Sequence, residues 1–367
     1  MLSRSSARRL VYFHCDHFEP WRSKPRTISV ENAELVAQFA ERTAKLDYAR
    51  RLTLFYRPHC RPINEPRTGG SFVPGDTLGF LPLDAGSLRI TSPAIRSVVE
   101  AGHELQLHLH HERVTANDRY SKETRWSDHF EGEGVAARDA SRFELLVQLS
   151  LETARQESGC AFDEWLFIHG NWALAASDPA VCRIENELEI LRRNGCVGDF
   201  TFTGQPRLPA CNPSFIEPAL VRTAFGLKAY DGPDADARVA WAAGALADQS
   251  DRLFIWSSRS GRIGQALDYR NAEVAARCES PQAWAEELAR RAIRLGDSLY
   301  VWTYAHSMSS QHGDVRSMLF PHEHSAVRSM FGFLFDGAAK IGMNVEFLTA
   351  SEVRRQILGG LSLPELR

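Results

Sequence analysis

The segment GHELQLHLHHE, residues 102–112, decides the fold of this chain. Leucines alternate with polar residues over 104–109, which predicts a strand, and Gly102 before it suits the end of a helix. The segment also holds four histidines and two glutamates in eleven positions. Because alternate residues of a strand share a face, His108 and His110 are expected to converge, and neutral imidazoles can hold a metal ion.

Two alternatives stay open for this segment. If the chain turns helical after the strand, the converging pair is His108 and Glu112, four positions apart. For any single histidine, the alternative is a polar strand end with side chains at the surface.

Strand-like and helical patterns alternate outward from this segment. Strands are predicted over 10–15, 52–56, 104–109, 165–168, 196–201, 253–256 and 298–304, and an apolar segment lies at 345–348. Helices are predicted over 31–51, 95–101, 142–157, 186–194, 283–295 and 323–340. This alternation is typical of βαβ units, and it predicts an α/β barrel in a single domain that spans 1–367.

Two stretches of the chain are predicted to be long loops, at 58–84 and 117–138. The first is rich in Pro, Gly and Arg, and the second is polar and charged. Both follow strand ends, which is the face where barrel enzymes build their sites. We therefore expect them to form walls of a substrate site.

The composition excludes several classes of function. A net charge of -3, with both signs mixed along the chain, offers no basic face for nucleic acid, so a neutral or small substrate is expected. The longest apolar runs fall far short of the roughly 20 residues of a membrane span. The apolar stretch after the N-terminal arginines is too short for a signal peptide, and seven scattered cysteines without a CxxC pair indicate reduced thiols. A cytoplasmic protein is expected, and its oligomeric state stays open.

A second polar cluster stands at the end of the first predicted strand. It contains His14, Asp16, His17 and Glu19. An aspartate at the tip of a barrel strand is typical of catalysis, and an adjacent Asp and His could supply a base and a metal ligand. A capping or loop aspartate is the alternative.

These segments together resemble the polysaccharide deacetylase superfamily, carbohydrate esterase family four. Asp16 with His17 stands where that family has an Asp-Asp pair, and GHELQLHLHHE stands where it has Gly-His-Glu followed by metal histidines. The later segments come in the family's order: IHGNWAL (168–174) at the Arg-x-Pro segment, GCVGDFTF (195–202) at the Gly-Tyr-x-x-Asp-Ser segment and WTYAHS (302–307) at the last strand. The resemblance implies a distorted (β/α)7 barrel with an Asp-His-His metal triad, an aspartate base and a histidine acid.

The resemblance assigns the metal ligands as follows. Asp16 is either the base, with His17 as the ligand, or the ligand itself, with Glu19 as the nearest carboxylate for the base. His108 matches the first metal histidine. The family's second histidine corresponds to Glu112, and His110 would serve in its place. Three imidazoles suit zinc, cobalt or nickel, with zinc expected here, whereas a carboxylate-rich set suits harder ions.

The remaining roles also follow from the resemblance. His306 matches the histidine that acts as general acid, with a structural histidine as the alternative. The segment with His169, Asn171 and Trp172 lacks the family's arginine, so these residues are expected to line a sugar site, although Trp172 could equally be core. Asp199 is expected to contact the substrate or orient His306. Arg57 and His59, after the second strand, are weaker candidates of the same kind.

The function predicted from these assignments is metal-dependent hydrolysis of an acyl group, an N-acetyl group above all, on an amino sugar or polysaccharide. One alternative is a barrel without activity that binds carbohydrate or a partner protein, since the Arg-x-Pro segment is missing. Another is a glycosidase, which needs two carboxylates, for example Asp16 and Asp199.

Overall fold

The computed structural model describes the strands and helices that carry the polar segments identified above. The described residues are 9–21, 28–45, 51–58, 61–63, 79–81, 83–110, 139–179, 182–202, 217–231, 234–242, 251–257, 282, 286, 289–290, 292–305 and 335–359. Of the predicted functional residues, His59, Glu112 and His306 lie outside them, as does the predicted loop 117–138.

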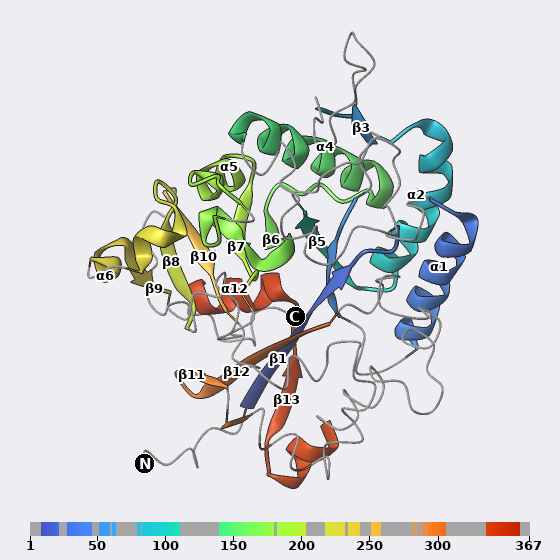
Figure 1. The fold of residues 1–367 in the computed structure, drawn as a ribbon. Coiled ribbons are helices and arrows are strands. Elements are labelled where there is room, and N and C mark those ends of the chain that lie inside the picture. Colours follow the sequence, from blue (N-terminus) through green and yellow to red (C-terminus); the bar gives the residue numbers. More distant parts are fainter. Residues whose placement is uncertain are drawn as a thin grey trace, which may run out of the picture.

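The fold is of the α/β class, as predicted, and its centre is one large sheet (Figure 1). Its parallel strands follow one another in the order β12 (Ser298–Ala305), β1 (Arg9–Phe18), β2 (Thr53–Tyr56), β5 (Glu104–Leu109), β6 (Trp165–His169), β7 (Cys196–Asp199) and β10 (Arg252–Ile255). The first half of β1 also pairs with β13 (Asn344–Phe347).

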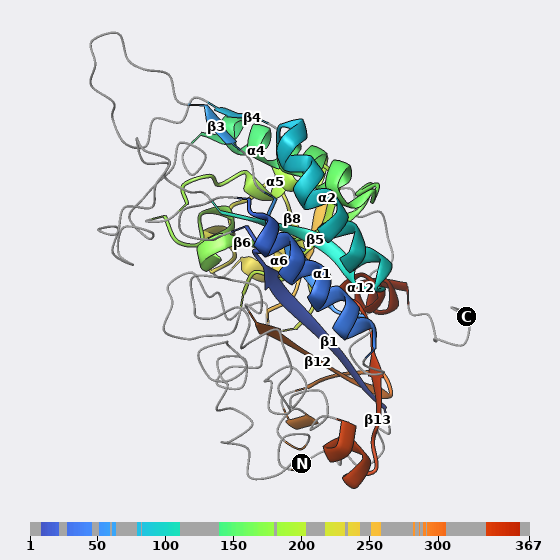
Figure 2. The same cartoon turned by 90° about the vertical axis from the view of Figure 1, so that its right-hand side faces the viewer.

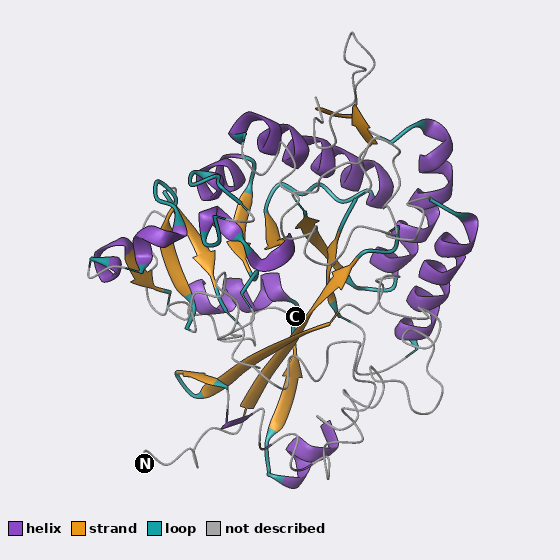
Figure 3. Ribbon diagram, viewed as in Figure 1, coloured by secondary structure: helices purple, strands orange, loops and turns teal. Residues whose placement is uncertain are grey.

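Antiparallel strands flank this parallel set at both ends. They are β11 (Ile293–Leu295) beside β12, and β8 (Ala219–Arg222) with β9 (Val239–Trp241) beyond β10. The sheet curls strongly, but within the described residues its two ends do not pair, so it is an open half-barrel (Figure 3). A closed (β/α)7 barrel is thus not formed by this part of the chain.

Helices cover the convex face of the sheet. They are α1 (Val30–Ala44), α2 (Ala85–Glu100), α4 (Ala140–Ser158) and α5 (Glu187–Arg193), and each packs on the next (Figure 2). Their apolar stripes meet every second residue of the strands, such as Tyr56, Leu107 and Phe167, in one core.

The concave face is filled by a second core that is rich in aromatic rings. Phe13, Phe200 and Trp302 contact one another there, with ring centroids 5.7–6.1 Å apart. Helix α12 (Ala350–Gly359), which the sequence did not predict, adds Val353 and Ile357 to this core. The curled sheet therefore encloses packed side chains rather than a channel.

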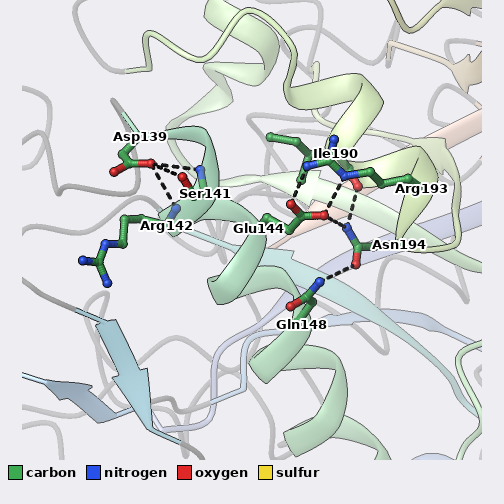
Figure 4. Close-up of polar contacts among 8 residues, drawn as sticks. All are labelled: Asp139, Ser141, Arg142, Glu144, Gln148, Ile190, Arg193 and Asn194. Carbon is green, nitrogen blue, oxygen red and sulfur yellow. Dashed lines mark hydrogen bonds and ion pairs between the residues drawn. The ribbon is translucent and has the colours of Figure 1, made fainter.

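Polar side chains join α4 to α5 on the convex side (Figure 4). Asp139 caps α4 by accepting from the backbone N–H groups of Ser141 and Arg142. One turn further on, Glu144 pairs with Arg193 and accepts from Asn194 Nδ2 at 3.1 Å. These bonds fix the end of the short helix α5 on its longer neighbour.

Several predicted boundaries differ from the structure. The predicted loop 58–84 contains a small hairpin of β3 (Arg61–Ile63) and β4 (Gly79–Leu81), and α2 begins at Ala85 rather than at 95. The predicted helix 283–295 is wrong at its end, where Ile293–Leu295 is the edge strand β11. No helix in the described parts of the chain is both long and apolar enough to cross a membrane.

Candidate metal centre

Strand alternation decides which residues of β1 face the candidate site. Leu10, Tyr12 and Phe18 belong to the convex core, whereas Val11 and Phe13 belong to the concave one. Continuing the alternation, His17 and Glu19 face the concave side and Asp16 faces the convex side. The same period turns Arg57 after β2, His108 of β5 and His110 directly after β5 toward the concave side.

Three of these side chains converge at the ends of the parallel strands β1 and β5, which flank β2 in the sheet. Glu19 Oε1 lies 3.6 Å from His108 Nε2 and 3.2 Å from His110 Nε2, and the two Nε2 atoms are 2.9 Å apart. His108 and Glu19 are buried, and the His110 side chain keeps 9% of its surface exposed. We call Glu19, His108 and His110 the interior cluster.

The surroundings orient each member of the interior cluster. His108 Nδ1 donates to the Ile168 carbonyl at 2.8 Å, which leaves the lone pair of Nε2 pointing into the cluster. Arg57 Nη1 donates to Glu19 Oε1 at 3.1 Å, and the Arg57 backbone N–H is tied to the Phe18 carbonyl. The carboxylate is therefore held by a guanidinium from the neighbouring strand.

The electrostatics keep both histidines neutral. Burial lowers the pKa of His108 below its ordinary value. Burial, followed by the nearby Arg57 guanidinium, holds the pKa of His110 well below its ordinary value. Neutral imidazole is the form that binds a metal ion, so the cluster needs no deprotonation of histidine near neutral pH.

Gly170, directly after β6, closes the cluster from the side. A Cβ at this position would lie 2.3 Å from His110 Cγ and 2.5 Å from its Nδ1. Only a residue without a side chain lets the chain pass this close to the imidazole. The glycine thus fixes the place of the His110 ring.

The geometry of the interior cluster fits a divalent metal. Ligand atoms about 2.0–2.1 Å from a tetrahedral zinc are about 3.3 Å apart, close to the three distances here. Two histidines and one glutamate are also a set found in catalytic zinc sites, where a fourth position stays open. The cluster is one of two groups in the described residues whose ligand atoms lie within 4.8 Å of one another.

The structure places the predicted ligands on two different faces. His108 and His110 come together as predicted, and His17 stands beside them, its ring centroid 4.8 Å from that of His108. Asp16 is not brought to the cluster, because it faces the convex side, where His14 Nε2 lies 3.3 Å from its Oδ2. Glu19, which the sequence offered only as a possible base, is the carboxylate that lies beside the two histidines.

Two of the predicted sugar-binding residues lie outside the interior cluster. His169 points to the convex side, where its Nε2 lies 3.2 Å from Glu187 Oε1. Asp199 accepts from the backbone N–H and the hydroxyl of Thr201, and burial raises the pKa of its carboxyl to about 7. Neither belongs to the interior cluster.

The other two predicted sugar-binding residues lie in the turn after β6. Asn171 and Trp172 fall in the 3-10 turn Gly170–Trp172, which begins at the glycine that touches His110. The Trp172 backbone has a positive φ of 56°, an uncommon conformation for a tryptophan. The side chain of Asn171 lies outside the described part.

Comparisons with known proteins add a weak structural likeness. No family model and no curated protein matches the chain. An α-mannosidase from Enterococcus faecalis V583 is similar in structure, with a TM-score of 0.42 and 10% identity. The match covers 98% of this chain and 30% of that one, so this chain spans less than a third of the mannosidase.

Proposed function

We propose that this chain is a metal-dependent hydrolase that removes an acyl group, and specifically an N-acetyl group, from an amino sugar or polysaccharide. The observation that carries the proposal is the convergence of Glu19, His108 and His110 at the ends of parallel strands. The resemblance to the polysaccharide deacetylases supplies the substrate class.

Each residue of the interior cluster has a role in this proposal. Glu19, His108 and His110 would hold the ion, with Arg57 orienting the Glu19 carboxylate. A divalent metal, zinc foremost and cobalt or nickel next, supplies Lewis acidity toward the acyl carbonyl and lowers the pKa of water toward 7. The partial exposure of His110 supports substrate access from its side.

Proton transfer falls to histidines rather than to Asp16 in this scheme. His17 shares the concave face with the cluster, so we assign to it the acceptance of the proton from water as the acyl carbon is attacked. His306 follows β12 closely and stays the predicted donor to the leaving nitrogen. The products are a carboxylate and a free amine.

The turn after β6 supports the carbohydrate part of the proposal. Backbone strain at a non-glycine residue is common at ligand sites, and Trp172 has such a backbone two residues after Gly170. An indole can stack on the apolar face of a pyranose. We assign Trp172 to the sugar and leave Asn171 as its neighbour in the same turn.

Metal content and acetate release test the proposal together. The wild type, purified without chelator, is compared with His108→Ala and Glu19→Gln for bound metal and for acetate release from acetylated amino-sugar oligomers. We expect the wild type to release acetate and both variants to lose activity with the ion of the interior cluster. If the wild type holds no metal and stays inactive after addition of zinc, cobalt or nickel, a carbohydrate-binding barrel is favoured instead. If it produces new reducing ends without releasing acetate, a glycosidase is favoured.

A further inference from the structure

A second group of ligand-type side chains lies on the convex side of β6, behind the interior cluster. His169 comes from the end of β6, Cys182 from the following loop and Glu187 from the first turn of α5. All three side chains are fully buried. We call them the outer cluster.

The distances in the outer cluster match those of a metal polyhedron. His169 Nε2 lies 3.2 Å from Glu187 Oε1, and Cys182 Sγ lies 3.7 Å from Glu187 Oε2. With a zinc–sulfur bond of about 2.3 Å and zinc–nitrogen and zinc–oxygen bonds of about 2.0 Å, tetrahedral geometry requires about 3.3 Å and about 3.5 Å. One ion could thus contact all three residues with small movements.

Neighbouring groups aim the outer cluster inward. The His169 Nδ1 contacts the Gly170 carbonyl, so that Nδ1 carries the proton and Nε2 faces the cluster. Glu187 Oε2 accepts from the Ala175 backbone N–H at 2.5 Å. The His169 backbone N–H donates to Thr201 Oγ1 at 2.7 Å, which fixes the strand end itself.

The backbone between these ligands is strained. Ala175 and Ala176 both have positive φ, 49° and 56°, a region that alanine rarely adopts. Such conformations persist only where the surroundings determine them strongly. An ion that ties Cys182 and Glu187 to β6 would impose this path on the loop.

We propose that the outer cluster binds a second transition-metal ion, zinc in the first place, through His169 Nε2, Cys182 Sγ and a carboxylate oxygen of Glu187. Imidazole and thiolate are the ligands that zinc prefers, and Cys182 loses its proton to solvent when the ion binds. The complete burial of the ligands gives this ion a structural role. It holds the loop after β6, and with it Gly170, against His110.

A competing arrangement is a buried His169–Glu187 ion pair with a neutral thiol. The Glu187 carboxylate supports it, since it raises the pKa of His169 above its ordinary value although burial alone lowers that pKa. The two arrangements differ in one measurable property, because only the metal site contains a bond between a metal ion and the Cys182 thiolate.

Cobalt substitution distinguishes them, because thiolate-bound Co²⁺ shows a near-ultraviolet charge-transfer absorption. The interior cluster holds no sulfur, so the absorption reports the outer cluster alone. The whole chain, produced in cobalt-supplemented medium, is expected to retain two Co²⁺ per chain and to show this absorption. Cys182→Ser should lose the absorption and one Co²⁺, whereas Cys160→Ser, at a half-buried cysteine outside both clusters, should keep both.

A second variant separates this inference from the proposed function. His110→Ala should lose the Co²⁺ of the interior cluster and keep the thiolate absorption of the outer cluster. A failure of the interior site is therefore distinguishable from a failure of the outer one. Glu187→Gln keeps the acceptor for Ala175 and is expected to weaken cobalt retention at the outer cluster by about tenfold or more. Wild type without thiolate absorption, or absorption that survives in Cys182→Ser, overturns the inference. If Cys182→Ser does not fold, X-ray absorption spectroscopy at the cobalt edge replaces it as the test. A wild-type spectrum without a sulfur ligand overturns the inference. A sulfur ligand in the wild type, together with weaker cobalt retention in Glu187→Gln, sustains it.

Discussion

Replacing Gly170 by alanine should damage the interior cluster without touching any of its ligands. The new Cβ would lie 2.3, 2.5 and 2.6 Å from Cγ, Nδ1 and Cδ2 of His110. The φ of Gly170 is outside the left-handed region, so its backbone suits alanine. The His110 ring is therefore the obstacle.

The size of the effect follows from these distances. Non-bonded carbon atoms rest about 3.5–4.0 Å apart, so the ring or the strand end must retreat by about 1 Å. Metal–ligand distances tolerate only about 0.2 Å. We expect metal affinity to fall about 10–100-fold, the range for lost orientation of a ligand, and the free energy of unfolding to fall by about 1–3 kcal/mol, the range for overpacking.

Two measurements test this reasoning. Metal affinity is measured by competition with a chromophoric chelator, and stability by urea unfolding of the metal-free protein. Gly86→Ala is the matched control. Gly86 lies in the first turn of α2, away from the interior cluster, and the nearest atom to its new Cβ would be Asp84 Oδ1 at 3.1 Å. In a His110→Ala background the stability cost of Gly170→Ala should largely vanish. If Gly170→Ala lowers the free energy of unfolding equally with and without the His110 ring, the ring is not the obstacle and the reasoning is refuted.

Two further predictions concern buried carboxyls. Asp16→Asn should keep the metal that Glu19→Gln loses, because Asp16 faces the convex side; metal loss in both variants, measured by elemental analysis, contradicts this placement. Burial raises the pKa of Glu157, which accepts from Tyr56 at 2.6 Å, to about 7. The native state thus binds this proton more tightly than the unfolded state, so stability is full below about pH 4.5 and falls as pH rises through 7, by on the order of 3 kcal/mol. Glu157→Gln should flatten this part of the urea-unfolding profile between pH 4.5 and 8, and an unchanged profile excludes Glu157 as its source.

The regular elements near the site were predictable from the sequence because their patterns are strong. The predicted strand 104–109 coincides with β5, and the helix predicted at 142–157 lies within α4, which Asp139 caps and Gly159 ends. Parallel strands in sequence order place the end of β5, with His108 and His110, between the ends of β2 and β6. The histidine pair thus followed from local periodicity alone.

Glu19 was predicted as a possible base rather than as a ligand because β1 is longer than predicted. The polar run His14, Cys15, Asp16 and His17 suggested that the strand ends at Cys15, but β1 continues to Phe18. Buried polar residues are tolerated in this part of β1 because both faces of the strand offer hydrogen-bond partners, such as Thr303 for His14. Strand alternation over the longer β1 selects Glu19 rather than Asp16.

Tertiary context decided the elements that sequence patterns placed wrongly. Helix α2 begins early despite Gly86, Ser87 and an internal Pro93, residues that lower helix propensity. The alanine- and arginine-rich segment before Gly296 favours a helix, yet Ile293–Leu295 pairs with β12 through a turn in which Gly296 has φ 57°. Pairing across the sheet edge outweighs propensity in that segment.

The end of β6 links the two clusters in a way that no single motif reveals. The Ile168 carbonyl accepts from His108, the next side chain belongs to the outer cluster, and Gly170 abuts His110. The three consecutive residues 168–170 therefore contact both histidines of the interior cluster and also contribute a ligand-type side chain, His169, on the convex face. A shift of a few tenths of an ångström in this strand end exceeds the tolerance of metal–ligand bonds. The outer cluster is thus placed to control the geometry of the interior one even though the two share no side chain.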